Sequence, residues 1–356
     1  MALPKNIFTG YFREGHIQGI AFDFQRRFVY CSFTTVLLKL DFEGNLLGSV
    51  ENLLGHLGCI AYDPKRNRIY GSFELKHDGI GAEIMKRTGK TISEEDAFYL
   101  VSFDAAAICR VGMDGEQDGV MRAVYLRDVV EDYNGREKDG ALHRYGCSGI
   151  DGISLGPVFG SFDPSIQKIM IAYGIFSDVE REDNDHQVLL QLDPSVVDAY
   201  AMPLNQKSLH HSGPEKAEAR YFFFTGNTRY GIQNLEYDPA TGYWFLAVYP
   251  GEKPQYENFR LFAIDGKIPP RMAPLKGRGG EEGALLSSAS IGKAPEKYAP
   301  CGSHFRWGST GLASVGDGTF YISKSGKLEE GRVRFSNLIL HGFDPKNPGW
   351  FSSAEE

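Results

Sequence analysis

The stretch YDPATGYWFLAVYPGEKPQYENFRLFAID, residues 237–265, holds the pattern that decides the fold. It opens on an aromatic residue followed by Asp, Tyr237-Asp238, and closes on an apolar residue followed by Asp, Ile264-Asp265. Between these markers lies a run of aromatic and β-branched residues, 243–249, which favours a strand. The Asp-Pro-Ala-Thr-Gly segment at 238–242 is typical of a tight turn. The stretch therefore predicts three consecutive strands, with the first two joined as a hairpin.

The same pair of markers recurs along the whole chain. The closing markers are Leu40-Asp41, Phe103-Asp104, Leu192-Asp193, Ile264-Asp265 and Phe343-Asp344. The opening markers are Phe22-Asp23, Tyr62-Asp63, Phe162-Asp163 and Tyr237-Asp238, with Gly316-Asp317 in the fifth place. The runs between them are residues 28–33, 69–73, 169–176, 243–249 and 320–323. Five copies of a unit made of short strands indicate a radial or stacked β architecture.

Each unit is expected to hold four strands, A to D. Strand A ends at the opening marker, strand B is the aromatic run, strand C ends at the closing marker, and strand D leads into the next unit. Residues 6–10, NIFTG, resemble residues 221–226, YFFFTG, which precede the fourth strand A. Residues 6–12 are therefore expected to supply strand D of the last unit and to close a ring. The expected units are residues 16–54, 55–142, 143–226, 227–300, and 301–350 together with 6–12.

This arrangement resembles the five-bladed β-propeller, and the resemblance covers nearly all of the chain as one all-β domain, residues 1–356. It is a likeness of architecture. Glycoside hydrolases, calcium-dependent nucleotidases, plant-type glutaminyl cyclases and sugar-binding lectins occur among five-bladed propellers, and none of their signatures is intact here, so the fold does not name a function. A six-bladed ring with a blade between Asp104 and Asp163 and a β-sandwich are the alternatives. A long C–D hairpin around residues 112–115 explains that interval more simply.

Bulk properties narrow the function classes. The formal net charge of −8 disfavours nucleic acid as a partner, because binding its phosphates needs clustered cations. No apolar run approaches the length of a membrane span, and the N-terminus lacks the apolar core of a signal peptide, so a cytoplasmic protein without membrane contact is expected. The five cysteines are widely spaced without a CxxC pair, which indicates neither a disulfide framework nor a thiolate zinc site. The oligomeric state stays open.

One face of the ring carries the longer loops. In a propeller the D–A and B–C connections share a face, and the B–C loops here are long and charged, which is typical of a binding rim. Three D–A connections repeat Arg, an aromatic residue and Gly: Arg144-Tyr145-Gly146, Arg229-Tyr230-Gly231 and Arg306-Trp307-Gly308. Units one and two place His16 and His56 at the equivalent point.

These rim residues predict an anion receptor around the axis, with the aromatic residues stacking on a sugar or base. The alternative is that each Arg merely pairs with a rim carboxylate such as Glu14, Asp178 or Glu182, and that the histidines are packed loop residues.

The five A strands give a second, independent signal. Their alignment places Gly19, Cys59, Gly152, Asn234 and Gly311 in one layer. The next layer on the same face holds Ala21, Ala61, Ser154, Glu236 and Ala313. The opposite face of these strands carries Ile20, Ile60, Ile153, Leu235 and Leu312. Small residues suit strands that crowd around an axis, and the fourth unit alone breaks both layers, with Asn234 and Glu236.

A carboxylate among alanines needs hydration, protonation, a partner or a bound cation, so Glu236 is the leading catalytic candidate. Asp151, at the start of the third strand A, is the candidate for the second carboxylate of an acid/base pair. A divalent cation on the central axis, beside Glu236, is the one cofactor that the pattern suggests. The alternatives are a Glu236 that binds channel water and an Asp151 that caps a turn.

The function expected from these patterns is binding of a small, polar, anionic ligand, such as a sugar acid or phosphorylated sugar, in the axial funnel. Hydrolase or lyase chemistry by Glu236 would follow. The alternative is a non-catalytic propeller that binds ligands or proteins through its rim. Arginines that share a pocket with a carboxylate pair would favour catalysis, and arginines consumed by rim ion pairs would favour the alternative.

Overall fold

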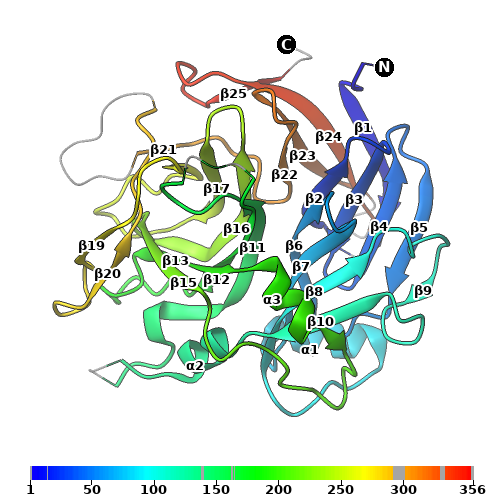
Figure 1. Ribbon diagram of the computed structural model, residues 1–356, viewed down its shortest axis with the longest axis horizontal. Coiled ribbons are helices and arrows are strands. Elements are labelled where there is room, and N and C mark those ends of the chain that lie inside the picture. Colours follow the sequence, from blue (N-terminus) through cyan, green and yellow to red (C-terminus); the bar gives the residue numbers. More distant parts are fainter. Residues whose placement is uncertain are drawn as a thin grey trace.

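The computed structural model describes residues 2–13, 15–137, 140–161, 163, 165–291, 301–328 and 333–353. Five β-sheets stand around a central axis as the blades of a five-bladed β-propeller, as predicted (Figure 1). Phe162, in the third opening marker, and Glu14, one of the expected rim carboxylates, lie outside the described residues.

The first two blades contain the N-terminal part of the repeat. Blade one comprises β2 (Ile17–Asp23), β3 (Phe28–Phe33), β4 (Val36–Asp41), β5 (Leu46–Glu51) and β9 (Met113–Asp114). Blade two comprises β6 (His56–Asp63), β7 (Arg68–Leu75), β8 (Ala97–Asp104), β10 (Met121–Tyr125) and β14 (Met202–Pro203). The helix α1 (Gly79–Thr88) lies in the B–C loop of blade two and ends at Gly89, whose φ of 65° suits glycine.

The remaining blades follow in chain order. Blade three comprises β11 (Cys147–Gly156), β12 (Lys168–Ile175), β13 (His186–Leu192), β15 (Ala219–Phe224), β20 (Glu282–Leu285) and β19 (Arg271–Pro274). Blade four comprises β16 (Thr228–Asp238), β17 (Tyr243–Pro250), β18 (Leu261–Asp265) and β21 (Gly302–Ser303). Blade five comprises β22 (Leu312–Ser314), β23 (Thr319–Leu328), β24 (Val333–Phe343), β1 (Asn6–Phe12) and β25 (Phe351–Ser353). The other helices are α2 (Arg127–Asn134), α3 (Pro194–Tyr200) and the 3-10 turn Arg144–Gly146.

The N-terminal strand closes the ring. β1 pairs antiparallel with β24, and Ile7 faces Leu338 in this pairing. The buried Thr9 hydroxyl lies 3.1 Å from both the backbone oxygen and the backbone nitrogen of Ser336. In Figure 1 the blue β1 lies beside the red β24, as the likeness between residues 6–10 and 221–226 predicted.

Two strand pairings differ from the simple repeat. The predicted long C–D hairpin of blade two is formed by β8 and β10, and Met113–Asp114 in its connection forms β9, which pairs in parallel with β5 of blade one. The hairpin β19–β20 comes from the chain between β18 and β21 of blade four, yet β20 pairs in parallel with β15 of blade three. No sixth sheet occurs in the described residues between Asp104 and Arg144.

The blades pack against one another through the apolar residues on the second face of the inner strands, as predicted. Ile20, Ile60, Ile153, Leu235 and Leu312 are all buried, and each belongs to a different one of five hydrophobic clusters. Burial of each such side chain is worth about 1.5–3 kcal/mol. Among the described residues, no helix is long and apolar enough to cross a bilayer.

The inner strands also share a local irregularity near the axis. The register of β2 against β3 shifts between Ile17 and Gly19, and that of β16 against β17 shifts between Ile232 and Asn234. Equivalent shifts occur in β6 and β11. A β-bulge of this kind re-aims the extra residue, which brings Gln18, Asp151 and Gln233 to one cavity on the axis.

Candidate functional site

Two cavities open toward the axis from opposite faces of the ring. The D–A cavity, about 190 Å³, is lined by residues of the D–A and B–C connections and by the bulged positions of the inner strands. The A–B cavity, about 490 Å³, is lined by the A–B turns and the other ends of the same inner strands. The predicted site residues are divided between these two cavities and the rim.

A buried ion pair lies in the wall of the D–A cavity. Lys76 Nζ lies 2.9 Å from Glu74 Oε2 and 3.2 Å from Asp78 Oδ2, and it also donates to the backbone oxygen of Ser148. Glu74 accepts the backbone N–H of Ile150. Burial alone would raise the pKa of Glu74, but the charges of Lys76 and His56 hold it below its ordinary value. Glu74 is therefore a fixed negative charge beside the cavity.

The Glu74 carboxylate lies against the backbone of β11, at a position that only glycine can occupy without displacing it. Gly149 has a φ of 129°, and a Cβ at this position would lie 1.8 Å from Glu74 Oε1. Any other residue would displace the ion pair, because that distance is far inside van der Waals contact.

Asp151 occupies the bulge of β11 and lines the same cavity. Its Oδ2 accepts a 2.9 Å hydrogen bond from Gln233 Nε2, and its backbone oxygen accepts one from the Ser72 hydroxyl. Burial and the charge of Glu74 raise the pKa of Asp151 to about 7, against the opposing effects of His56, Lys76 and Gln233. A carboxyl group with this pKa exchanges its proton near neutral pH.

His56 stands between the two carboxyl groups. Its Nδ1 lies 3.7 Å from Glu74 Oε2, an ion-pair distance rather than a hydrogen bond. Burial lowers the pKa of His56, but Glu74 and Asp151 outweigh burial and leave it above the ordinary value. The neighbouring His16 also lines the cavity, and burial together with Arg334 lowers its pKa. The two predicted rim histidines thus share one cavity with opposite tendencies to be charged.

Two tyrosines complete the D–A cavity. Tyr230, from the predicted Arg-Tyr-Gly motif, is 51% exposed and has a φ of 63°. Its ring lies 6.5 Å from that of Tyr249, edge to face. Burial and the nearby Asp151 raise the pKa of Tyr249. These rings supply aromatic surface next to the titratable groups.

The three motif arginines lie outside the described set of residues that lines this cavity. Arg144 lies 3.1 Å from Glu281 and 4.0 Å from Asp132. Arg229 lies 3.8 Å from Glu252, and both side chains are exposed. The guanidinium of Arg306 lies 4.3 Å from the ring centre of Trp307. Their partners differ from the rim carboxylates named from the sequence.

The other two motif aromatics also lie outside the set that lines the cavity. Tyr145 is buried and donates a 2.8 Å hydrogen bond to Glu281, while the guanidinium of Arg278 lies 4.2 Å from the centre of its ring. Trp307 lies beneath Arg306. Of the three predicted aromatics, Tyr230 is the one brought to the D–A cavity.

Asn234 fills the axis between the two cavities. Its side chain is fully buried and donates hydrogen bonds of 2.8 Å to the Gln18 backbone oxygen and 3.1 Å to the Ser309 backbone oxygen. Its Oδ1 lies 3.5 Å from Cys59 Sγ. These contacts tie blade four to blades one, two and five.

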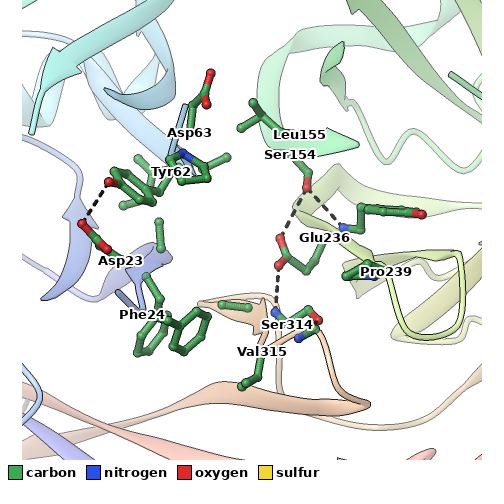
Figure 2. A pocket seen from close by; sticks show the side chains of 18 of the residues that line it. Asp23, Phe24, Tyr62, Asp63, Ser154, Leu155, Glu236, Pro239, Ser314 and Val315 are labelled. Carbon is green, nitrogen blue, oxygen red and sulfur yellow. Dashed lines mark hydrogen bonds between the residues drawn. The ribbon is translucent and has the colours of Figure 1, made fainter. Parts of the chain in front are cut away.

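Glu236 lines the A–B cavity, together with all four other members of its predicted layer. One carboxylate oxygen accepts the Ser314 backbone N–H at 2.7 Å, and the other lies 3.4 Å from the Ser154 hydroxyl (Figure 2). Burial raises the pKa of Glu236 to about 8, despite these two donors. Glu236 and Asp151 therefore occupy different cavities and do not form one acid/base pair.

Sequence reasoning missed Glu74, Lys76, Gln233 and Tyr249. The segment Phe73-Glu74-Leu75-Lys76 alternates apolar and charged residues at the end of a strand, a signal that its charges share one face. Gln233 has no such signal, because a bulge in β16 re-aims it, and Tyr249 is one of several aromatic residues in β17 with nothing to mark it out.

A divalent cation on the axis was the one cofactor expected. Among the described residues, no group of three or more His, Cys, Asp or Glu has an arrangement that could hold a metal ion. The Glu236 carboxylate has donors around it in Ser314 and Ser154, whereas Ca²⁺ and Mg²⁺ prefer a shell of oxygen ligands. The observed contacts of Glu236 are hydrogen bonds, and a cation on the axis stays a prediction.

No protein-family model and no curated protein matches the sequence. Solved structures similar to the chain include the Dos1 propeller, with 12% identity and a TM-score of 0.36 over 95% of this chain and 57% of that one. The holo pyranose dehydrogenase PQQ domain from Coprinopsis cinerea has 12% identity and a TM-score of 0.39, over 91% and 82% of the two chains. A gluconolactonase from Xanthomonas campestris has 11% identity and a TM-score of 0.37, over 95% and 75%. The propeller assignment rests on the strand pairing, not on these likenesses.

Proposed function

We propose that the D–A cavity is a general acid/base site that binds a small polar ligand and performs hydrolase or lyase chemistry on it. The observation that carries the proposal is that a buried carboxyl group, Glu74, and a partly buried one, Asp151, have opposed pKa shifts beside one histidine. Groups whose environments push their pKa values apart are typical of acid/base assignments.

The residues divide into roles. Asp151 transfers the proton, because its pKa of about 7 leaves both protonation states populated at neutral pH. Glu74, paired with Lys76, supplies a fixed charge that raises the pKa of His56 against the effect of burial. Gln233 holds Asp151 in place, and Tyr230 and Tyr249 offer aromatic faces on which a sugar ring stacks.

The residues that line the D–A cavity do not fix the charge of the ligand. The preference for a sugar acid or a phosphorylated sugar was based on the three motif arginines, which lie outside the cavity lining. The basic groups His56 and Lys76 line the cavity together with the carboxylates of Glu74 and Asp78, which lie at ion-pair distance from them. A neutral polyhydroxylated ligand therefore fits the cavity as well as an anionic one.

A ligand panel tests the proposal. Saturation-transfer NMR with hexoses, hexuronates and hexose phosphates measures binding, and 4-nitrophenyl glycosides and glycuronides report hydrolysis. Turnover should follow the protonation of a group with a pKa near 7, and Asp151→Asn should reduce it at least about a hundredfold, the scale for losing a general acid or base. Asp104→Asn, an exposed carboxylate at the end of β8, is the matched control. An Asp151→Asn rate equal to that of the wild type would contradict the proposal.

A non-catalytic propeller is the second candidate. Arg144 and Arg229 are engaged by carboxylates on the rim, as expected for a ligand-binding or protein-binding scaffold. Binding of a panel member without turnover, unaffected by Asp151→Asn, would favour this alternative.

A further inference from the structure

The A–B cavity holds one carboxylate that lacks a cationic partner. Its other acidic residues are neutralised at the mouth, because Asp23 lies 2.9 Å from Arg26 and Asp63 lies 3.2 Å from Arg66. Glu236 accepts from the Ser314 backbone and the Ser154 hydroxyl, and among the described residues no Lys, Arg or His stands within ion-pair distance of it. The carboxyl group of Glu236, with no cationic side chain beside it, is therefore the unsatisfied feature of this cavity.

Apolar and aromatic surface surrounds that carboxylate. Figure 2 shows Glu236 on one side of the cavity and the hydrogen-bonded pair Asp23 and Tyr62 on the other. Phe24, Leu155, Pro239 and Val315 form other parts of the cavity wall. A volume of about 490 Å³ is within the range of small-molecule sites. A site of this composition suits a molecule with one charged group on a compact apolar body.

We propose that the A–B cavity binds a small organic cation, with its ammonium group against Glu236 and its apolar body against Phe24, Pro239 and Val315. The ligand supplies the positive charge that the protein does not, and a buried carboxylate and aromatic rings both attract an ammonium ion. This site lies at the opposite end of the axis from the D–A cavity and is independent of the function proposed there.

Binding at this site depends on pH through Glu236. Burial raises the pKa of Glu236 to about 8, so at neutral pH the carboxyl group is largely protonated and must release its proton when a cation binds. The affinity for a cation should therefore rise as pH increases to about 8 and then level off. The other titratable groups that face the cavity or pack against Glu236 are Asp23, Tyr62, Asp63, Lys65, Tyr237 and Asp238.

Choline and its uncharged isostere 3,3-dimethylbutan-1-ol test the charge requirement. Choline keeps its charge at every pH, so any change in its affinity comes from the protein. NMR titration of the full chain should show choline binding that strengthens about tenfold per pH unit below the pKa of Glu236. The isostere should bind at least about tenfold more weakly at pH 9, the scale of 1.4 kcal/mol of lost charge attraction. Equal affinity for both probes, or no binding of choline, would overturn the proposal.

Two further measurements connect the binding to Glu236. Glu236→Gln should remove both the choline affinity and its pH dependence, whereas Glu257→Gln, an exposed glutamate paired with His304, should leave both unchanged. Calorimetry of the unmodified protein in two buffers with different ionisation enthalpies should detect about one proton released per choline at pH 7. This second readout stands even where the variant fails to fold, and a zero proton count would contradict a role for Glu236. Tighter binding of the uncharged isostere at pH 6 than at pH 9 would contradict the proposal, because it would show that the protonated carboxyl group donates a hydrogen bond to a neutral ligand.

Discussion

Asn234 and Glu236 lie two residues apart on β16, and each joins that strand to other blades by a different set of hydrogen bonds. Asn234 donates to backbone oxygens of Gln18 and Ser309 and closes the axis. Glu236 accepts from Ser314 and Ser154 and faces the A–B cavity. The broken symmetry of blade four therefore separates the two ends of the channel.

The stability of the protein should depend on the protonation of Glu236. The pKa of about 8 in the folded protein exceeds the ordinary value of 4.5, so the folded state binds the proton more tightly and loses stability as pH rises from about 4.5 to 8. Glu236→Gln removes this loss and should be more stable than the wild type at pH 9 by a few kcal/mol, since each pKa unit corresponds to about 1.4 kcal/mol. Urea denaturation of both proteins at pH 5 and pH 9 measures the difference. If the free energies of unfolding of the two proteins differed by the same amount at pH 5 and at pH 9, the prediction would be wrong.

The ion pair between Glu74 and Lys76 should behave as a coupled unit. Glu74→Gln leaves Lys76 buried beside Asp78 alone and should cost on the order of 3–5 kcal/mol. Lys76→Met should cost a similar amount, whereas the double variant should lose less than the sum of the two. A double-mutant cycle in urea measures this coupling, and simple additivity would show that the pair is not coupled.

The hydrogen bonds of Asn234 should be needed for the closed axis. Asn234→Ala removes two donors to backbone oxygens and should cost about 1–3 kcal/mol. Asn234→Asp places carboxylate oxygens against the same carbonyl oxygens, so it should cost more at pH 7 and recover part of the loss at pH 4. Thermal unfolding at both pH values distinguishes the two variants; equal losses for Ala and Asp would mean that the hydrogen bonds contribute little.

Arginines of the rim should differ strongly in their contribution to stability. Arg229→Ala should change the free energy of unfolding by less than about 1 kcal/mol, because the ion pair with Glu252 is exposed. Arg278→Ala should cost about 3–5 kcal/mol, since this buried guanidinium pairs with Glu137 and Glu281, and its loss removes the ion pair of the Glu137 carboxylate. Denaturation curves of the two variants give the comparison, and a large loss in Arg229→Ala would reverse the order.

The fold followed from the sequence because its signals are local and repeated. The paired Asp markers recur five times, and the likeness of residues 6–10 to residues 221–226 was enough to place β1 beside β24. The hairpin β19–β20 could not be predicted, because its pairing with β15 joins segments about one blade apart and leaves no local pattern.

The site was only partly predictable. The layer of Glu236 followed from strict alternation along the inner strands, and its five members line one cavity. Asp151 and Gln233 sit at bulges, where the alternation of side chains along a strand fails. Alternation could therefore not predict which residues surround them. The partner of Arg144 is Glu281, from a distant hairpin, which explains why the repeated arginine motif did not reveal its own contacts.

The pairing of β1 with β24 has a consequence for how the protein is made. On the ribosome, residues 6–12 are made long before residues 333–343 and lack their strand partner until β24 has been synthesised. Until then the A–B cavity lacks the wall that blade five supplies, and β1 presents an unpaired edge to other chains. Ring closure therefore waits for the synthesis of β24, and a ligand that needs the A–B cavity, which blade five helps to line, serves as a reporter of ring closure.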